Sequence, residues 1–245
     1  SSTSSVLHLA NISEAVAGGN DDDGGGGGDA RGEPPPAAAP APEVAATPAA
    51  AAPSIEGLPA GDYRIDPAHA SLVFTVNHLG FSHYTAQFTR FTADLTLDPA
   101  NPATAQLTAS VDPTSISLPS PPDGFVAELT GKQWLDAGAF PQMTFKSTQV
   151  TVTGANTADV TGDFTLHGVT KPVTLAMTFN GGYVGHPQDP NARIGFSAKG
   201  ALKRSDFGIA YGVPAPGSTM GVSDEVTIAI EAEFSGPPLA DKPAQ

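Results

Sequence analysis

The chain has 245 residues, contains no cysteine, and carries a formal net charge of −14 at pH 7. This negative charge, without any cluster of Lys and Arg among aromatic residues, argues against nucleic-acid binding. The lack of cysteine excludes disulfides, thiolate nucleophiles, Cys-ligated metals and a Cys-linked lipid anchor. No apolar run approaches the roughly 18 residues that a membrane-spanning helix needs, so we predict no transmembrane segment.

The first 60 residues are predicted to be a low-complexity arm and tether. They include five consecutive glycines, Gly24 to Gly28, and residues 31–60 hold eight prolines among many alanines. Such a segment has too few large apolar side chains for their burial to offset the entropy lost when the chain becomes ordered. Its composition therefore favours a disordered or extended, polyproline-II-like conformation. A tether of this kind holds one body near another, so residues 1–58 are a candidate attachment segment for a protein partner. The chain begins Ser-Ser-Thr, and we expect any signal peptide to be absent from it.

From Asp62 onward, apolar residues alternate with polar ones, which is the period of half-buried β-strands. Turn signals such as Asp98-Pro99, Asp112-Pro113 and Asn180-Gly181-Gly182 separate the alternating segments. About eight strands are predicted this way. They lie around residues 72–78, 91–97, 107–111, 143–145, 160–166, 173–179, 194–202 and 226–234.

A helix is predicted only over residues 125–136, FVAELTGKQWLD. Eight antiparallel strands with one short helix predict an all-β, lipocalin-like closed barrel over residues 61–235, because closure removes unpaired strand edges. Residues 236–245 are then a short C-terminal tail. Small inward positions such as Ala93, Ala109 and Gly200 leave two alternatives open. Larger residues opposite them fill the interior, or the barrel encloses a dry cavity that accepts an apolar guest.

Six segments carry a resemblance to a known family: YRIDPAHASLVFTVNHLGFSH, FTRFTADLTLDPANP, WLDAGAFPQMTFKS, VTGDFTLHGVTKPVTL, KRSDFG and VSDEVTIAIEAEF. In order and spacing they resemble the YceI-like family of lipocalin-like, polyisoprenoid-binding proteins, over residues 62–234. The resemblance implies an eight-stranded barrel whose elongated channel holds an isoprenoid or fatty-acyl chain. It also implies no settled catalytic activity and an exported protein of the bacterial periplasm or cell surface.

The family pattern, carried over residue by residue, assigns the ligand-binding wall. His78 lies on the apolar face as a candidate headgroup contact, with a satisfied histidine at the end of the barrel as the alternative. The predicted ligand-binding residues are Leu72, Phe74, Val76, His78, Phe91, Leu95, Phe145, Phe164, Leu175, Phe196 and Ile228.

Catalytic or metal chemistry finds little support in the sequence. The spacing of His69, His78 and His83 matches no common ligand set, and neither HExxH, GxSxG, a P-loop nor a Rossmann fingerprint occurs. His69 is expected to cap backbone groups in a turn, and Asp206 to accept backbone hydrogen bonds in a tight turn formed by Gly208. We therefore predict no catalytic residues, no metal and no required cofactor.

Two hypotheses for function follow. The first is non-catalytic binding or carriage of a long apolar lipid, such as an isoprenoid, quinone, carotenoid or fatty-acyl chain, inside the barrel. The second is an accessory or structural subunit of a larger complex, such as a membrane-bound one, anchored by the N-terminal arm. The two are compatible, and an enzymatic function ranks third.

Overall fold

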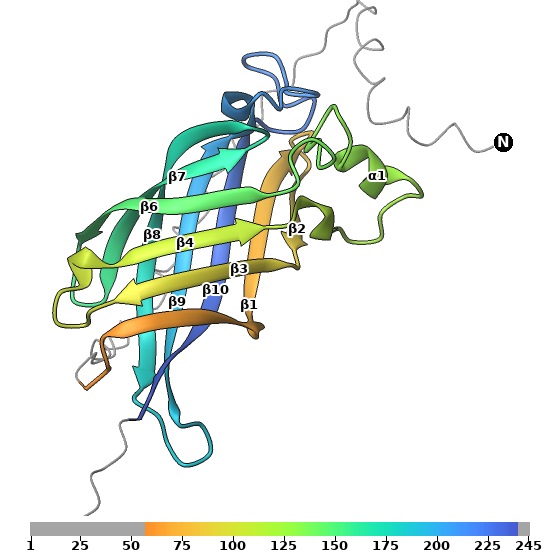
Figure 1. The fold of residues 1–245 in the computed structure, drawn as a ribbon. Helices are drawn as coiled ribbons and strands as arrows, with labels where there is room; N and C mark the ends of the chain where they lie inside the picture. Colours follow the sequence, from red (N-terminus) through yellow and green to blue (C-terminus); the bar gives the residue numbers. More distant parts are fainter. Residues whose placement is uncertain (1–56, 240–245) are drawn as a thin grey trace, which may run out of the picture.

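The computed structural model describes residues 57–239, so nearly all of the predicted arm, and the end of the predicted tail, lie outside the described residues. Within these described residues, ten strands, one α-helix and short 3-10 turns follow one another (Figure 1). The strands are β1 (Gly61–His78), β2 (Ser82–Phe88), β3 (Phe91–Leu97), β4 (Gln106–Val111), β5 (Ile116–Ser117), β6 (Met143–Val152), β7 (Thr157–Leu166), β8 (Val169–Tyr183), β9 (Asn191–Lys203) and β10 (Glu225–Pro238). The helix is α1 (Phe125–Leu129), and the 3-10 turns are η3 (Pro102–Thr104), η4 (Pro113–Ser115) and η5 (Arg204–Phe207).

Eight of these strands close into an antiparallel barrel, as predicted. Neighbouring strands run in the order β1, β3, β4, β6, β7, β8, β9 and β10, and β10 pairs again with β1. The closing pair aligns Phe74 with Ile228 and Leu72 with Ile230, residues that lie more than 150 positions apart in the chain. Closure pairs both edges of the sheet, which removes the free edges that an open sheet would expose.

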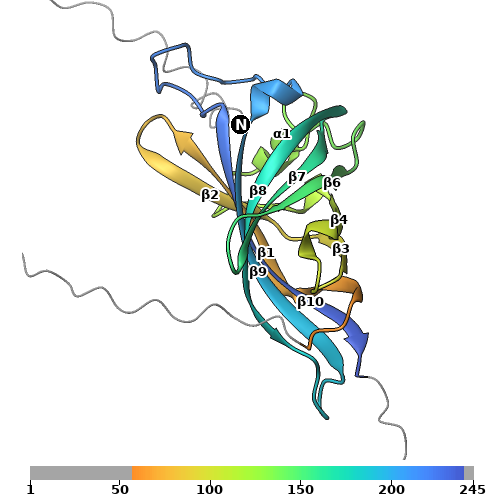
Figure 2. The same ribbon diagram turned by 90° about the vertical axis from the view of Figure 1, so that its left-hand side faces the viewer.

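The first strand is long and bent, and it serves two neighbours along one edge. Its beginning pairs with β3, with Tyr63 opposite Leu95, while its end pairs with β2, with Phe74 opposite Ala86. The register against β10 shifts between Ile65 and Ala70, at a segment that includes Pro67, which has no N–H to donate. Figure 2 shows the β1–β2 hairpin standing away from the barrel wall. The sequence analysis missed β2, although its alternating Tyr84, Ala86 and Phe88 had the right period.

The helix is shorter than predicted. It ends at Leu129, and the segment up to residue 139 is made of turns closed by backbone hydrogen bonds, such as Asp136 N to Gly131 O at 2.8 Å. Thr130 and Gly131 are both poor helix formers. Leaving the helix lets Trp134 and Leu135 pack against the cluster around Met143 and Phe207.

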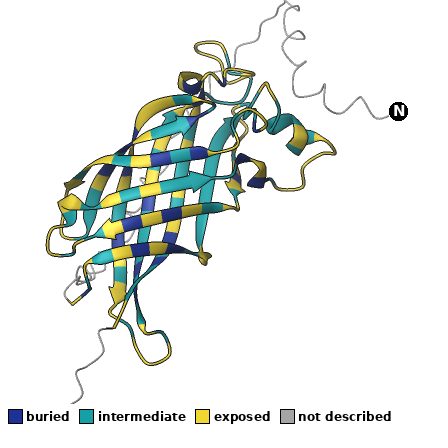
Figure 3. Ribbon diagram, viewed as in Figure 1, coloured by how far each residue is buried: buried dark blue, intermediate teal, exposed yellow. Residues whose placement is uncertain are grey.

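Packing inside the barrel differs between its two ends. Along β10, the inward residues Val226, Ile228 and Ile230 are only half-buried, whereas Ala232 and Phe234 are fully buried. Buried and exposed positions alternate along β3 as the period-two pattern requires (Figure 3). One end of the barrel is therefore filled by its own side chains, and the other is not. The filled end, called the closed end below, is formed by Leu58, Tyr63, Ile65, Ala93, Leu95, Phe179, Ala192, Ile194, Ala232 and Phe234.

Candidate functional site

The unfilled part of the barrel is an apolar cavity of about 850 Å³. All eight barrel strands contribute to its wall, together with β2, α1 and the loop that follows η5. Its floor is made by residues of the closed end, among them Ile65, Ala93 and Phe234. Sites for small molecules span about 300–1,000 Å³, so this cavity is at the large end of that range.

Small inward side chains meet across strands and create the cavity. Ala93 lies opposite Ala109, Gly200 opposite Ile228, and Ala198 opposite Ile230. A small residue beside another small one, or beside a medium-sized one, does not fill the space in front of the sheet. Of the two alternatives left by the sequence, the structure therefore shows the cavity rather than the filled interior.

Ten of the eleven predicted binding residues lie on the cavity wall, and Leu95 does not. Leu95 faces inward too, but it lies opposite Tyr63 and Leu107 in the closed end, where it is 8% exposed. Alternation places a side chain on the inner face of a barrel but not at a height along its axis. That these ten residues bind a ligand stays a prediction.

Several wall residues were not predicted. Tyr84 and Phe88 come from the missed strand β2, Trp134 comes from the segment predicted to be helical, and Tyr211 and Met220 come from a loop that has no periodic pattern. The β2 residues carried the period-two signal of an inward face in the sequence. Phe88 packs beside Phe74, with ring centroids 5.4 Å apart, and so completes the wall next to β1.

The one buried cation on the wall is Arg204, within the described residues. Its guanidinium donates to four backbone carbonyls, those of Ser223 (3.0 Å), Ile209 (2.9 Å), Tyr211 (2.7 Å) and Val222 (2.8 Å). It also stacks over the ring of Trp134, with its Cζ atom 5.0 Å from the ring centroid. Burial lowers the pKa of Arg204. Its hydrogen bonds hold the loop after η5 against the barrel, which is a structural task.

The turn around Arg204 differs from the prediction in one respect. Gly208 adopts a left-handed conformation, with φ of 76°, as expected for the residue that ends η5. The predicted acceptor, Asp206, is exposed, and the carboxylate that caps the turn is Asp224. Asp224 accepts from the backbone N–H of Ser205 at 2.8 Å and from its hydroxyl at 2.6 Å.

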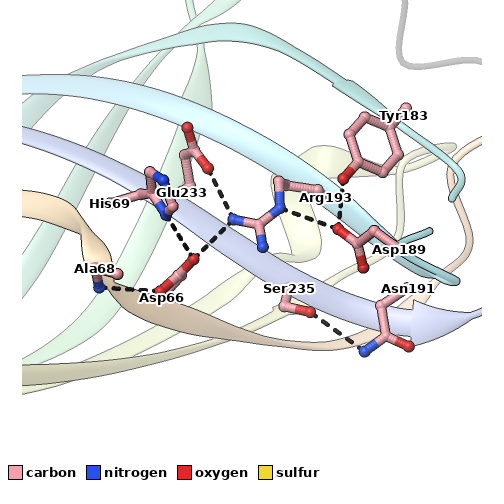
Figure 4. Close-up of polar contacts among 9 residues, drawn as sticks. All are labelled: Asp66, Ala68, His69, Tyr183, Asp189, Asn191, Arg193, Glu233 and Ser235. Carbon is pink, nitrogen blue, oxygen red and sulfur yellow. Dashed lines mark hydrogen bonds and ion pairs between the residues drawn. The ribbon is translucent and has the colours of Figure 1, made fainter.

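A polar network surrounds Arg193 on the outside of the closed end (Figure 4). The guanidinium donates to Asp66 at 2.9 Å, to Glu233 at 2.8 Å and to Asp189 at 3.3 Å. The hydrogen bond from Arg193, with a second from His69, lowers the pKa of Asp66 to about 2. Asp189 also accepts from the hydroxyl of Tyr183, which raises the pKa of that tyrosine.

The carboxylates in this network do not make a convincing metal site. Asp66, His69 and Glu233 bring one ligand atom each within 4.8 Å of one another. However, Arg193 already occupies both carboxylates, and a cation would have to displace the guanidinium. In the predicted turn, Asp66 rather than His69 caps the backbone, because its Oδ1 accepts from the N–H of Ala68 at 2.9 Å.

No helix within residues 57–239 is long and apolar enough to cross a bilayer.

The polar groups on the cavity wall are few, and among the titratable ones are His78, Tyr84, Glu128, Arg204 and Tyr211. Burial raises the pKa of Tyr84 above its usual value. The wall is thus an apolar surface with isolated polar groups, which is suited to binding an apolar molecule.

Comparisons with known proteins agree with this geometry. Residues 63–234 match the family model described as the YceI-like domain. A UPF0312 protein of Vibrio parahaemolyticus is 39% identical over 180 residues, which are 70% of this chain and 88% of that protein. A UPF0312 protein of Pseudomonas putida is 40% identical over 169 residues, 67% of this chain and 83% of that protein.

Solved structures share the fold. BcnA of Burkholderia cenocepacia is 26% identical with a TM-score of 0.59, and the match covers 69% of this chain and 98% of BcnA. A domain from Saccharophagus degradans, described as a polyisoprenoid binding domain, has a TM-score of 0.55 and covers 73% of this chain and 100% of that domain. Since it is only 13% identical, its likeness shows the fold alone.

Proposed function

This chain belongs to the YceI-like domain family, and we propose that its barrel binds a long apolar molecule, of the isoprenoid or fatty-acyl class, without catalysing a reaction. The observation that carries the proposal is the cavity of about 850 Å³ with its apolar wall. A void lined by Leu, Ile, Val and Phe stays dry and takes up apolar guests. The same ligand class is in the description of the Saccharophagus degradans domain, which has this fold.

The cavity offers enough binding free energy for such a ligand. Each buried methylene contributes about 0.8 kcal/mol, so one five-carbon isoprene unit contributes roughly 3 to 4 kcal/mol before entropic losses. A few units in the cavity therefore suffice for tight binding. Shape and length, rather than hydrogen bonds, select the ligand, because most of the wall has no donor or acceptor to offer.

The arrangement of titratable groups supports binding without catalysis. Acid-base catalysis needs a pair of such groups that converge on one reacting atom. Arg204 has committed its donors to backbone carbonyls. Glu128 belongs to α1, while His78 lies at the end of β1 and bridges to Val222. These groups come from different elements, and no hydrogen bond in the described residues joins any two of them.

Two sequence predictions stay predictions. The accessory-subunit hypothesis depends on residues 1–58, nearly all of which lie outside the described residues. Periplasmic or extracellular location, which the family resemblance implies, is likewise untested. Neither is needed for the lipid-binding proposal.

Substitution of Phe74 tests the proposal. The full chain is mixed with geranylgeraniol or palmitate, as prenyl and fatty-acyl probes, and native mass spectra are recorded before and after denaturation. We expect a probe adduct on the wild-type chain that denaturation removes, and none on Phe74→Asp, because a carboxylate on the wall would lose its hydration. Chain purified from its source organism, measured in the same way, would reveal the natural ligand.

The matched control is Thr75→Asp, one residue along the same strand. Thr75 lies on the outer face, where its hydroxyl is 3.1 Å from that of Thr85. We expect this variant to keep the adduct. Absence of an adduct on the wild-type chain with either probe would overturn the proposal. So would an unchanged adduct on a Phe74→Asp variant that circular dichroism shows to be folded.

A further inference from the structure

Two segments at the open end of the barrel form one continuous surface, called the hairpin–loop patch here. It consists of residues 77–84, which are the turn between β1 and β2 with the strand ends beside it, and residues 208–223, which are the loop between η5 and β10 without its last residue, Asp224. Figures 1 and 2 both place the two segments at the end of the barrel that carries α1. Leu79 N donates to Gly221 O at 2.9 Å, and Asn77 exchanges hydrogen bonds with Ser223 at 2.8 and 3.0 Å. The patch is therefore one structural unit.

The patch is free of formal charge. Neither segment contains Asp, Glu, Lys or Arg, although residues 61–245 hold seventeen acids and ten bases. The closed end, in contrast, displays Arg193, Asp66, Asp189 and Glu233 on its outside. An acidic protein is repelled by anionic lipid headgroups, and an uncharged face is the one with which it can approach them closely.

Large apolar side chains are exposed on this patch. Phe81 is 78% exposed, Met220 48% and Tyr211 41%. Tyr211 and Met220 also line the cavity, as does Leu79, two residues before Phe81 in the sequence. Since Tyr211 and Met220 are both exposed and part of the cavity wall, apolar side chains connect the outside of the patch with the interior of the barrel. Aromatic and apolar side chains on a neutral face suit the boundary between headgroups and acyl chains.

We propose that the hairpin–loop patch docks on the surface of a lipid bilayer, so that an apolar ligand passes between bilayer and cavity without crossing water. This inference rests on the proposed function, because it assigns the route by which the proposed ligand enters. Docking is shallow and reversible, since only a few side chains reach the acyl region.

Vesicle flotation and lipid transfer test the proposal with the full chain. Vesicles of phosphatidylcholine are used first, then the same vesicles with phosphatidylglycerol added, and the transferred probe is geranylgeraniol. We expect wild-type chain to float with the vesicles and the variant Phe81→Ser, at a residue outside the cavity wall, to float about tenfold less, as burial of such a side chain predicts. Transfer of the probe from vesicles slows by a similar factor. Adduct formation with probe dispersed in dilute ethanol stays unchanged.

The matched control is Val152→Ser. Val152 is also an exposed apolar side chain, at 49%, but it ends β6 at the side of the barrel away from α1 (Figure 1). This variant should float and exchange probe like the wild-type chain. An equal loss of flotation in Val152→Ser and in the patch variant would overturn the proposal, because it would show that any exposed apolar side chain adsorbs to the vesicles.

Other outcomes separate this proposal from the binding function. A wild-type chain that takes up dispersed probe but never floats would overturn the docking and leave the binding function standing. A chain that floats but takes up no probe from any source would overturn the binding function, and with it the transfer route. A concentration-dependent dimer in analytical ultracentrifugation that Phe81→Ser dissolves would assign the patch to a second copy of the chain and overturn membrane docking.

Discussion

The two ends of this barrel are built from the same strands but are finished in opposite ways. At the closed end, Ile194 and Ala192 are fully buried and Tyr63 is 1% exposed, while a network around Arg193 covers the outside. At the open end, inward residues such as Ile228 and Val226 stay half-buried around a cavity, and the rim includes the uncharged hairpin–loop patch, where Phe81 is exposed. A single sheet can thus supply both a packed core and a binding chamber, with side-chain size deciding which.

The two ends therefore differ in their roles: the closed end stabilises the fold, and the open end forms the proposed binding site. The closed end buries apolar surface within the protein itself, which stabilises the fold without a ligand. The open end leaves apolar surface that only a guest can cover. Substitutions at the two ends should therefore differ in what they damage.

The largest effect is expected from truncating matched isoleucines. Ile194→Ala, at the closed end, should lower the free energy of unfolding by about 3 kcal/mol, because it leaves a cavity in a packed cluster. Ile228→Ala should cost only about 1 kcal/mol, since that side chain already faces empty space and loses fewer contacts. Urea denaturation of ligand-free protein measures both. Equal losses would show that the two ends are packed alike.

Glycine-to-alanine substitutions, which add a methyl group, test the same difference in packing between the two ends. A Cβ on Gly236 would clash with Cε1 of Tyr63, whose hydroxyl is fixed by a 2.6 Å hydrogen bond to Pro59 O. We expect Gly236→Ala to cost about 1–3 kcal/mol, as overpacking does.

Gly200→Ala is its counterpart at the cavity. The new Cβ would lie 2.8 Å from Cδ2 of Leu175, the end of a flexible side chain that lines the cavity and has room to turn. Its cost should stay below about 1 kcal/mol. Thermal unfolding of both variants provides the comparison, and a greater loss for Gly200→Ala would contradict the assignment of free space to that side.

The smallest effect concerns the polar network and its pH dependence. Because its pKa is lowered to about 2, mainly by the hydrogen bond from Arg193, the Asp66 carboxylate stabilises the fold when it is charged. This contribution is complete above the unfolded-state pKa of about 4 and is lost as the pH falls through about 2. The urea midpoints of wild-type chain and Asp66→Asn should therefore differ at pH 6 and converge toward pH 2.

Asp94→Asn is the control for this experiment. Its exposed ion pair with Arg64 is a surface contact, with Nε and Oδ1 3.2 Å apart, and contributes little to stability. A difference between wild-type chain and Asp66→Asn that persisted unchanged at pH 2 would mean that the carboxylate acts through its shape rather than its charge.

Much of this architecture could be predicted from the sequence, because strands and turns leave patterns in short stretches of the chain. Alternation with period two placed Phe74, Phe145 and Phe196 on the inner face, and turn residues separated the strands. Family motifs over residues 62–234 pointed to the same barrel. Ten of the eleven predicted wall positions were found at the cavity for this reason.

Other features needed the folded chain. The height of a residue along the barrel depends on strand tilt and register, so Leu95 could not be assigned to the closed end from alternation. Residues 125–136 had a helical pattern, yet the helix ends before the poor helix formers Thr130 and Gly131, and Trp134 and Leu135 pack against a core cluster from turns. The loop after η5 has no periodic pattern, and its path is fixed by long-range contacts, such as those of Arg204 with the carbonyls of Ile209 and Tyr211 and that of Leu79 with Gly221.

The sequence by itself therefore determined the fold class and the inner face of the barrel, since both depend on neighbours along the chain. Tertiary structure alone decided where the interior is filled, where it is hollow, and which loops meet at its opening. Those properties depend on which side chains lie beside each other on neighbouring strands, as Ala93 lies beside Ala109, and on contacts such as Leu79 with Gly221 between distant segments. Packing depends on pairs of side chains that are brought together by folding, and the order of residues along the chain does not reveal these pairs.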